Sequence, residues 1–306
     1  MTDSDWKKEA SRIADGIRRR VLEHTVRNDG GYVSQACSSA EILATLYARV
    51  MNLGVPDAPI APRPYAGTPG PDNDVYRTGV DFNGGVRDDL DRFILSPTHY
   101  SLVLYAALIE TGRMTPDGLD MFNRDGSSVE MIGAEHSPGM EVMTGSLGQG
   151  LAQAVGMALG RRLKGATGRV VVMMSDGEFQ IGMTWESIQF ASHYSLDNLI
   201  VVVDANGQQC DGVVESVMCI EPLDRRIDSF GGRVVVVNGH DVDEIATAAS
   251  LQPDGRPLFV LARTDPCRGM DLLRSRAPKL HYLRFKCECE KRAWAGLLDA
   301  WPAEVE

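Results

Sequence analysis

Short runs of Val, Ile and Leu alternate with helical stretches through the second half of this 306-residue chain. Strands are expected at 169–175, 198–204, 233–238 and 258–263, and helices at 183–193, 223–230 and 242–251. Nearly continuous apolar runs are typical of strands buried on both faces, and the intervening helices indicate right-handed crossovers. The pattern therefore predicts an α/β fold, a doubly wound parallel sheet with helices on both faces.

The first third of the chain is expected to be helical. Apolar side chains recur on one helix face from Trp6 to Val21, the Gly30–Gly31 pair ends that helix, and Ser38 or Ser39 would cap a second one. Residues 54–90 are rich in Pro and Gly, so they are expected to be an irregular segment at a surface or interface. We expect one domain over 1–306, with a helical region 1–90, a sheet core of about 91–264 and a C-terminal extension 265–306.

Composition excludes several classes of function. The formal net charge of −11 argues against a nucleic-acid partner, because phosphate binding needs clustered Lys and Arg. The apolar runs are too short for a signal peptide or a bilayer span, so no membrane partner is expected. Six cysteines are scattered along the chain and are expected to be free thiols, which favours a cytoplasmic protein.

Polar residues follow two strands that should be neighbours in the sheet. Asp176 and Gly177 follow the first strand, and Asn206 follows the second, with a separation of 206 − 176 = 30 residues. Ligands of open α/β sheets bind outside the carboxyl ends of the strands. A carboxylate, an amide and a backbone carbonyl are hard oxygen ligands suited to Mg²⁺ or Ca²⁺. Either residue alone would more often cap a helix or fill a turn, but their joint placement favours a ligand site.

A resemblance to a known family rests on these residues and on four further motifs. Residues 175–212 resemble the thiamine-diphosphate signature, G-D-G followed about thirty residues later by Asn, although Ser175 replaces the first Gly. DRFILSPTHYS at 91–101, TGSLGQG at 144–150, NGHD at 238–241 and the late His281 are similar to motifs of the N-terminal half of transketolases. The likeness is strongest to transketolases encoded as two separate subunits, and it covers nearly the whole chain.

The resemblance implies roles for particular residues. Mg²⁺ (or Ca²⁺) would be bound by the side chains of Asp176 and Asn206 and the backbone carbonyl of Gln208. Thiamine diphosphate would be bound by His99, Gly145, Ser146, Leu147, Asp176, Gly177, Glu178, Asn206 and His281. The two histidines would contact the diphosphate, and Gly177 and Glu178 would line its pocket. The residues expected to take part in catalysis are His99, His281 and Glu186.

Several positions depart from the family pattern. Tyr32 stands where transketolases carry a His that contacts the substrate, and Met131 stands where they carry a second one. Ile181 stands where transketolases carry a Glu that takes part in proton transfer between the two paired active sites. Loss of side chains that hydrogen-bond substrate hydroxyls is expected to change the class of substrate. A modified sugar, a cyclitol precursor or a 2-oxo acid would each be compatible with these replacements. The residues expected to contact substrate are Tyr32, Arg124 and His136.

The resulting expectation is the N-terminal subunit of a two-subunit transketolase-like enzyme that transfers a two-carbon ketol unit from a ketose to an aldehyde. In the family a second, pyrimidine-binding domain supplies the Glu that activates the cofactor, and this chain has no room for it. We therefore expect a heterotetramer that includes a pyrimidine-domain partner subunit. Two alternatives stay open, an E1-type subunit of a 2-oxo acid decarboxylase or dehydrogenase and a non-catalytic assembly homologue.

Overall fold

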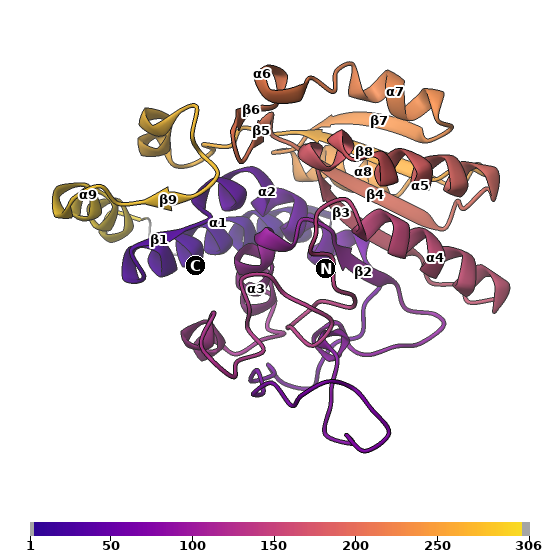
Figure 1. The fold of residues 1–306 in the computed structure, drawn as a ribbon, viewed down its shortest axis with the longest axis horizontal. Helices are drawn as coiled ribbons and strands as arrows, with labels where there is room; N and C mark the ends of the chain where they lie inside the picture. Colours follow the sequence, from indigo (N-terminus) through magenta and orange to yellow (C-terminus); the bar gives the residue numbers. More distant parts are fainter. Residues whose placement is uncertain (1–2, 302–306) are drawn as a thin grey trace.

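The centre of the molecule is a parallel five-stranded sheet in the order β2-β3-β4-β8-β7. A computed structural model describes residues 3–301 of the chain. The strands are β2 (Arg92–Leu95), β3 (Val170–Ser175), β4 (Leu199–Ala205), β7 (Arg233–Asn238) and β8 (Leu258–Arg263). Each predicted strand is present, with its ends shifted by a residue at most, and the predicted parallel α/β sheet is confirmed (Figure 1).

The apolar runs are continuous because both faces of the sheet are covered. In β3, Val171 and Met173 belong to one buried apolar cluster, whereas Val170, Val172 and Met174 belong to the cluster on the opposite face. Successive side chains of a strand point to opposite faces, so a strand covered on both needs apolar residues at every position.

Helices cover both faces of the sheet. The first cluster contains residues of α1 (Asp3–Arg27), α2 (Val33–Thr45), α3 (Ser101–Glu110) and α8 (Val242–Ala249). The opposite cluster contains residues of α4 (Gly150–Leu163), α5 (Gly182–His193) and α7 (Leu223–Ser229). Figure 1 shows α1, α2 and α3 grouped together, with α4 and α5 along the sheet. The predicted doubly wound arrangement follows from these two layers.

The predicted start of α2 was wrong. The helix begins at Val33, directly after Tyr32, so Ser38 and Ser39 lie in its interior. Their hydroxyls have other partners, since Ser39 Oγ donates to the carbonyl of Gln35 at 2.6 Å and Ser38 Oγ donates to Asp204 at 2.6 Å. A serine hydroxyl inside a helix returns to the carbonyl four residues earlier or contacts another element, and only tertiary structure decides which.

The C-terminal extension packs on the first two helices. Its strand β9 (Leu283–Arg284) pairs antiparallel with β1 (Gly30–Gly31), and its helix α9 (Glu288–Asp299) buries Trp294 in a third apolar cluster with Leu22 and Val33. The expectation of free thiols throughout was wrong for one pair, because Cys287 and Cys289 form a disulfide at the start of α9. The extension thereby brings residues near 281 beside those near 32.

Much of the Pro-rich segment 54–90 lies away from the sheet (Figure 1), although Phe82 belongs to the first apolar cluster. Its only helical turn is a 3₁₀ segment at Gly79–Asn83, and single bridges join Ile60 to Met114 and Pro64 to Ser127. Three short elements follow β4, namely β5 (Gln208–Gln209), β6 (Gly212–Val213) and α6 (Val214–Met218). Short helical turns also lie at Leu46–Val50, Thr98–Tyr100, Pro116–Met121, Asp176–Gln180 and Asp271–Arg276. Within residues 3–301, no helix has the length and apolar character needed to span a bilayer.

Candidate functional site

The carboxyl ends of β3 and β4 meet as the sequence predicts. Ser175 pairs with Asp204 in the parallel register, so the residues that follow the two strands are neighbours. Asp176 Oδ2 accepts a hydrogen bond from the Gly207 amide at 2.7 Å, which joins the two loops directly. The helical crossover between the strands therefore places Asp176 beside Asn206, although they are 30 residues apart in the sequence.

Asp176 is a buried carboxylate with one open oxygen. Its side chain is 4% exposed, and Oδ1 has no hydrogen-bond partner among the residues that the structure describes. Burial raises the pKa of Asp176 to about 7, because a low-dielectric surrounding disfavours the charged form. A buried carboxylate oxygen that lacks a donor is suited to binding a cation, which would restore its charged form.

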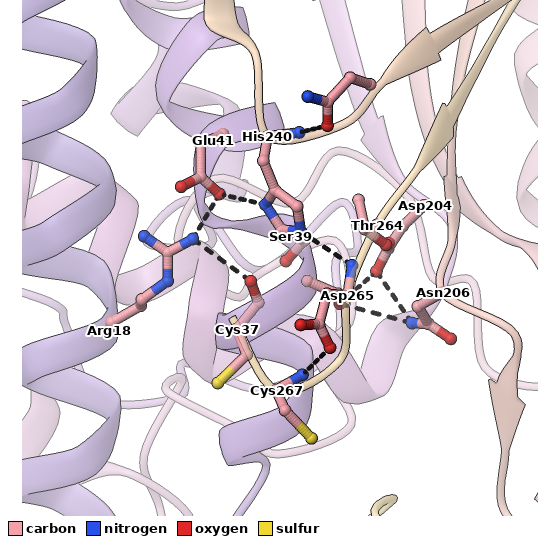
Figure 2. A network of polar contacts seen from close by, with 12 residues as sticks. Arg18, Cys37, Ser39, Glu41, Asp204, Asn206, His240, Thr264, Asp265 and Cys267 are labelled. Carbon is pink, nitrogen blue, oxygen red and sulfur yellow. Dashed lines mark hydrogen bonds and ion pairs between the residues drawn. The ribbon is translucent and has the colours of Figure 1, made fainter. Parts of the chain in front are cut away.

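Asp204, which no sequence motif marks, fixes the orientation of Asn206. It is fully buried at the end of β4 and accepts hydrogen bonds from Ser38 Oγ, Tyr100 Oη at 2.9 Å and Thr264 Oγ1. Asn206 Nδ2 donates to the same carboxylate at 3.1 Å, so the amide nitrogen faces the protein (Figure 2). The amide oxygen of Asn206 faces the other way and accepts from the amide of Gln208 at 2.9 Å.

Glu178 holds three loops together beneath the site. It is fully buried, and its Oε1 accepts from Ser96 Oγ and from the Gly148 amide at 3.2 Å. Its Oε2 accepts from the Ser175 amide at 2.9 Å. Ser96 follows β2, Ser175 ends β3 and Gly148 belongs to the TGSLGQG turn. The predicted position of Glu178 in the lining of the pocket is therefore wrong, because the side chain lies behind it.

A cavity of about 570 Å³ lies over these strand ends. It contains most of the residues that the resemblance implied, although they come from distant parts of the chain. Those in its lining are Tyr32, His99, Gly145, Ser146, Leu147, Gly177, Asn206, Gln208 and His281. Residues of the lining that were not predicted from the sequence include Gln35, Thr98, Tyr100, Ile132 and Gln180. Thr98, Tyr100 and Gln180 lie within the matched motifs, whereas Gln35 and Ile132 lie outside them and are placed here only by the fold.

The two histidines of the cavity face each other. The rings of His99 and His281 lie 4.9 Å apart between centroids, and the Tyr32 ring lies 5.8 Å and 5.6 Å from them respectively. Burial lowers the pKa of His99 to about 3 and also lowers the pKa of His281. Both imidazoles are therefore neutral at pH 7, and each carries one N–H donor.

Another histidine from a matched motif, His240, lies outside the cavity. Its Nε2 accepts from the Asp265 amide at 2.8 Å, so the proton is on Nδ1, which donates to Glu41 at 3.0 Å. Arg18 forms an ion pair with the same Glu41 carboxylate (Figure 2). These contacts join the loop after β8 to α1 and α2, which gives His240 a structural position behind the site.

Three predicted residues lie away from the cavity. Arg124 and Glu186 are exposed, and neither contributes to its lining. His136 lines a separate cavity of about 370 Å³, where it contacts the Tyr65 ring at 4.6 Å between centroids and Glu130 at 3.2 Å. Over residues 3–301 there is no group of three or more His, Cys, Asp or Glu side chains arranged to hold a metal. The ligands predicted from the sequence are not such a group, because they comprise the Asp176 carboxylate, the Asn206 amide and the backbone carbonyl of Gln208.

Known proteins resemble the chain in sequence. The family model described as "Transketolase, thiamine diphosphate binding domain" matches residues 86–269. A transketolase family protein of Sinorhizobium fredii is 35% identical over 94% of this chain and 94% of its own length. One of the subunits of an apulose-4-phosphate transketolase, from Actinobacillus succinogenes, is 31% identical over 90% of both chains. The 6-deoxy-6-sulfo-D-fructose transketolase subunit SqwG of a Clostridium species is 31% identical over 93% of this chain and 94% of its own.

Solved structures show the same fold. The transketolase of Campylobacter jejuni superposes with a TM-score of 0.70 at 19% identity, over 98% of this chain. The match covers 47% of that protein, so the chain spans about half of its length.

Proposed function

This chain belongs to the transketolase family, and we propose that it is the N-terminal, cofactor-binding subunit of a two-subunit transketolase-like enzyme, acting as a single cofactor-binding domain. The enzyme would transfer a two-carbon ketol unit from a ketose to an aldehyde. The observation that carries the proposal is the buried Asp176 carboxylate with an open oxygen at the strand ends, below a cavity that contains His99 and His281. Thiamine diphosphate, when bound, supplies the electron sink that lets a carbon–carbon bond beside a carbonyl break.

The residues present fit the cofactor and a divalent metal. Asp176 Oδ1, Asn206 Oδ1 and the Gln208 carbonyl would hold Mg²⁺ (or Ca²⁺), because no described residue donates to the first and Asp204 fixes the orientation of the second. His99 and His281 would donate N–H groups to diphosphate oxygens as neutral imidazoles. Gly177 has no close neighbour that prevents approach of a ligand to its backbone, since a Cβ there would meet only Gln209 Cβ at 3.7 Å.

The remaining cofactor contacts belong to two loops. Gly145, Ser146 and Leu147 line the cavity and would lie against the thiamine. Glu178 would act indirectly, since it joins those residues' turn to the ends of β2 and β3. Glu186 is exposed on α5, so a role for it in linking paired sites depends on the assembled enzyme.

We propose that the chain assembles with a pyrimidine-domain partner subunit, in a heterotetramer of two copies of each. Two relatives of nearly the same length as this chain carry the word subunit in their names, which supports a split enzyme. The expected location is the cytoplasm; Cys37, Cys210, Cys219 and Cys267 are free, whereas Cys287 and Cys289 form a disulfide.

The proposed substrates are a ketose and an aldehyde that carry an unusual acidic group or skeleton. One relative is named for apulose 4-phosphate and another for 6-deoxy-6-sulfo-D-fructose, so the one name carries a phosphate and the other a sulfo group. Tyr32 lines the cavity and would contact the substrate, together with the apolar Ile132 and Ile181. Arg124 and His136 lie outside this cavity, so we assign them no contact. The relatives carry transketolase names, and no observation favours the E1-type or assembly alternatives.

The test is calorimetric titration of Mg²⁺ and thiamine diphosphate into the chain mixed with its pyrimidine-domain partner, followed by a ketol-transfer assay. We expect binding that is lost in Asp176→Ala and kept in Asp228→Ala, which alters an exposed carboxylate of α7. Absence of binding, or equal binding by Asp176→Ala, would refute the proposal. Pyruvate decarboxylation without ketol transfer would instead identify an E1-type enzyme.

A further inference from the structure

Another cavity, distinct from the one that contains His136, adjoins the candidate site and is lined by two arginines. It has a volume of about 390 Å³ and is bordered by Tyr32, Met131, Arg276, Tyr282 and Arg284. Tyr32 also lines the 570 Å³ cavity, so one side chain forms a wall of both. A substrate that extends from His99 and His281 past Tyr32 would therefore reach the arginines.

Arg284 provides uncompensated positive charge in the cavity lined by the two arginines. It forms no ion pair with any residue of the described range 3–301, and its guanidinium lies 5.3 Å from the centre of the Tyr282 ring. Tyr282 in turn packs edge-on against Tyr32, with 4.9 Å between ring centroids. The aromatic face supports the guanidinium from one side and leaves its N–H groups free to bind an anion.

Arg276 is held more firmly and keeps one open donor. Its guanidinium forms an ion pair with Glu290 at 2.6 Å and donates to the backbone carbonyl of Arg284. Its Nε is buried and has no hydrogen-bond partner in the part of the chain described. A buried N–H without an acceptor is costly, and an anionic ligand oxygen would satisfy it.

We propose that Arg276 and Arg284 form a subsite for an anionic group, a phosphate or a sulfonate, at the far end of the ketose or aldehyde substrate. This rests on the proposed function, because the substrate's reacting end must lie at the cofactor cavity. Arg284 supplies the charge and Arg276 a fixed donor, while the Tyr32 ring separates the anion from the reacting carbons. The phosphate and the sulfonate share a tetrahedral oxyanion chemistry that guanidinium groups bind well.

The kinetic test uses the reconstituted two-subunit enzyme with matched acceptors. These are D-glyceraldehyde 3-phosphate against D-glyceraldehyde, and sulfoacetaldehyde against glycolaldehyde. Arg284→Gln should lower kcat/KM for an anionic acceptor about 10- to 100-fold, mainly through KM, and leave the neutral acceptors within about 3-fold. Arg284→Lys should restore part of the loss. Arg292→Gln, at an exposed arginine of α9 that lines neither cavity, should have no effect.

The two acceptor pairs also distinguish the phosphate from the sulfonate. The anion that the subsite binds is the one for which Arg284→Gln causes the larger loss of kcat/KM relative to the neutral acceptor. Equal losses for charged and neutral acceptors, or no loss for either, would overturn the subsite. A separate measurement needs no catalysis, namely ³¹P line broadening of D-glyceraldehyde 3-phosphate by the full chain, which Arg284→Gln should reduce. If ketol transfer is absent but the Arg284-dependent broadening persists, the proposed function fails and the anion subsite stands.

Discussion

Replacing Asp176 by Asn should stabilise the metal-free protein at alkaline pH while abolishing cofactor binding. The pKa of Asp176 is about 7 in the folded chain and 3.8 in its ordinary state. The folded protein therefore binds the proton more tightly, and its stability falls as the pH rises from about 4 to about 7. A difference of about 3 pKa units corresponds to about 4 kcal/mol at pH 8.

The Asn variant recovers only part of this energy. Its amide oxygen can still accept from the Gly207 amide, but its nitrogen would occupy the position of the open Oδ1, where a buried donor without a partner costs about 1–3 kcal/mol. The net expectation is that Asp176→Asn is about 1–3 kcal/mol more stable than the parent protein at pH 8. Near pH 4 the gain should vanish, because the carboxyl of the parent is then protonated.

The assay is urea unfolding in EDTA at several pH values, followed by the same series with Mg²⁺ and thiamine diphosphate. The difference in the free energy of unfolding between variant and parent isolates the contribution of Asp176. The other carboxylates titrate in both proteins, so their contribution cancels. We expect the ligands to stabilise the parent and leave Asp176→Asn unchanged. Parallel stability curves for the two proteins from pH 4 to pH 8 would refute the account of a buried, metal-directed carboxylate.

Two further predictions concern the walls of the site. Glu178→Ala removes the acceptor of the Ser96 hydroxyl and of two backbone amides, so the free energy of unfolding should fall by about 3–5 kcal/mol. A loss below about 1 kcal/mol in urea unfolding would contradict the role given to Glu178. His99→Phe keeps a ring beside Tyr32 and His281 but removes the N–H donor, so the Kd for thiamine diphosphate should rise at least about 10-fold in calorimetry, with thermal stability little changed. An unaltered Kd would remove His99 from the diphosphate site.

The sheet could be predicted because its signal is local. The apolar runs at 169–175 and 198–204 are nearly free of polar positions, and only a strand covered on both faces requires this. The placement of Asp176 beside Asn206 followed as well, since a crossover of one helix between adjacent parallel strands brings their carboxyl ends together. The start of α2 was placed wrongly, because the hydroxyl of Ser38 bonds to Asp204, which is 166 residues away in the sequence.

By itself, the sequence determined the fold, the family and the residues that end the strands, because each of these depends on periodicity or on short motifs. Tertiary structure alone decided which side chains share a cavity. It placed Glu178 behind the site, His136 in a different cavity and Arg284 beside Tyr32, through the pairing of β9 with β1. These positions depend on contacts between segments far apart in the chain, such as those of Tyr32 and Tyr282, and a linear pattern carries no record of such contacts.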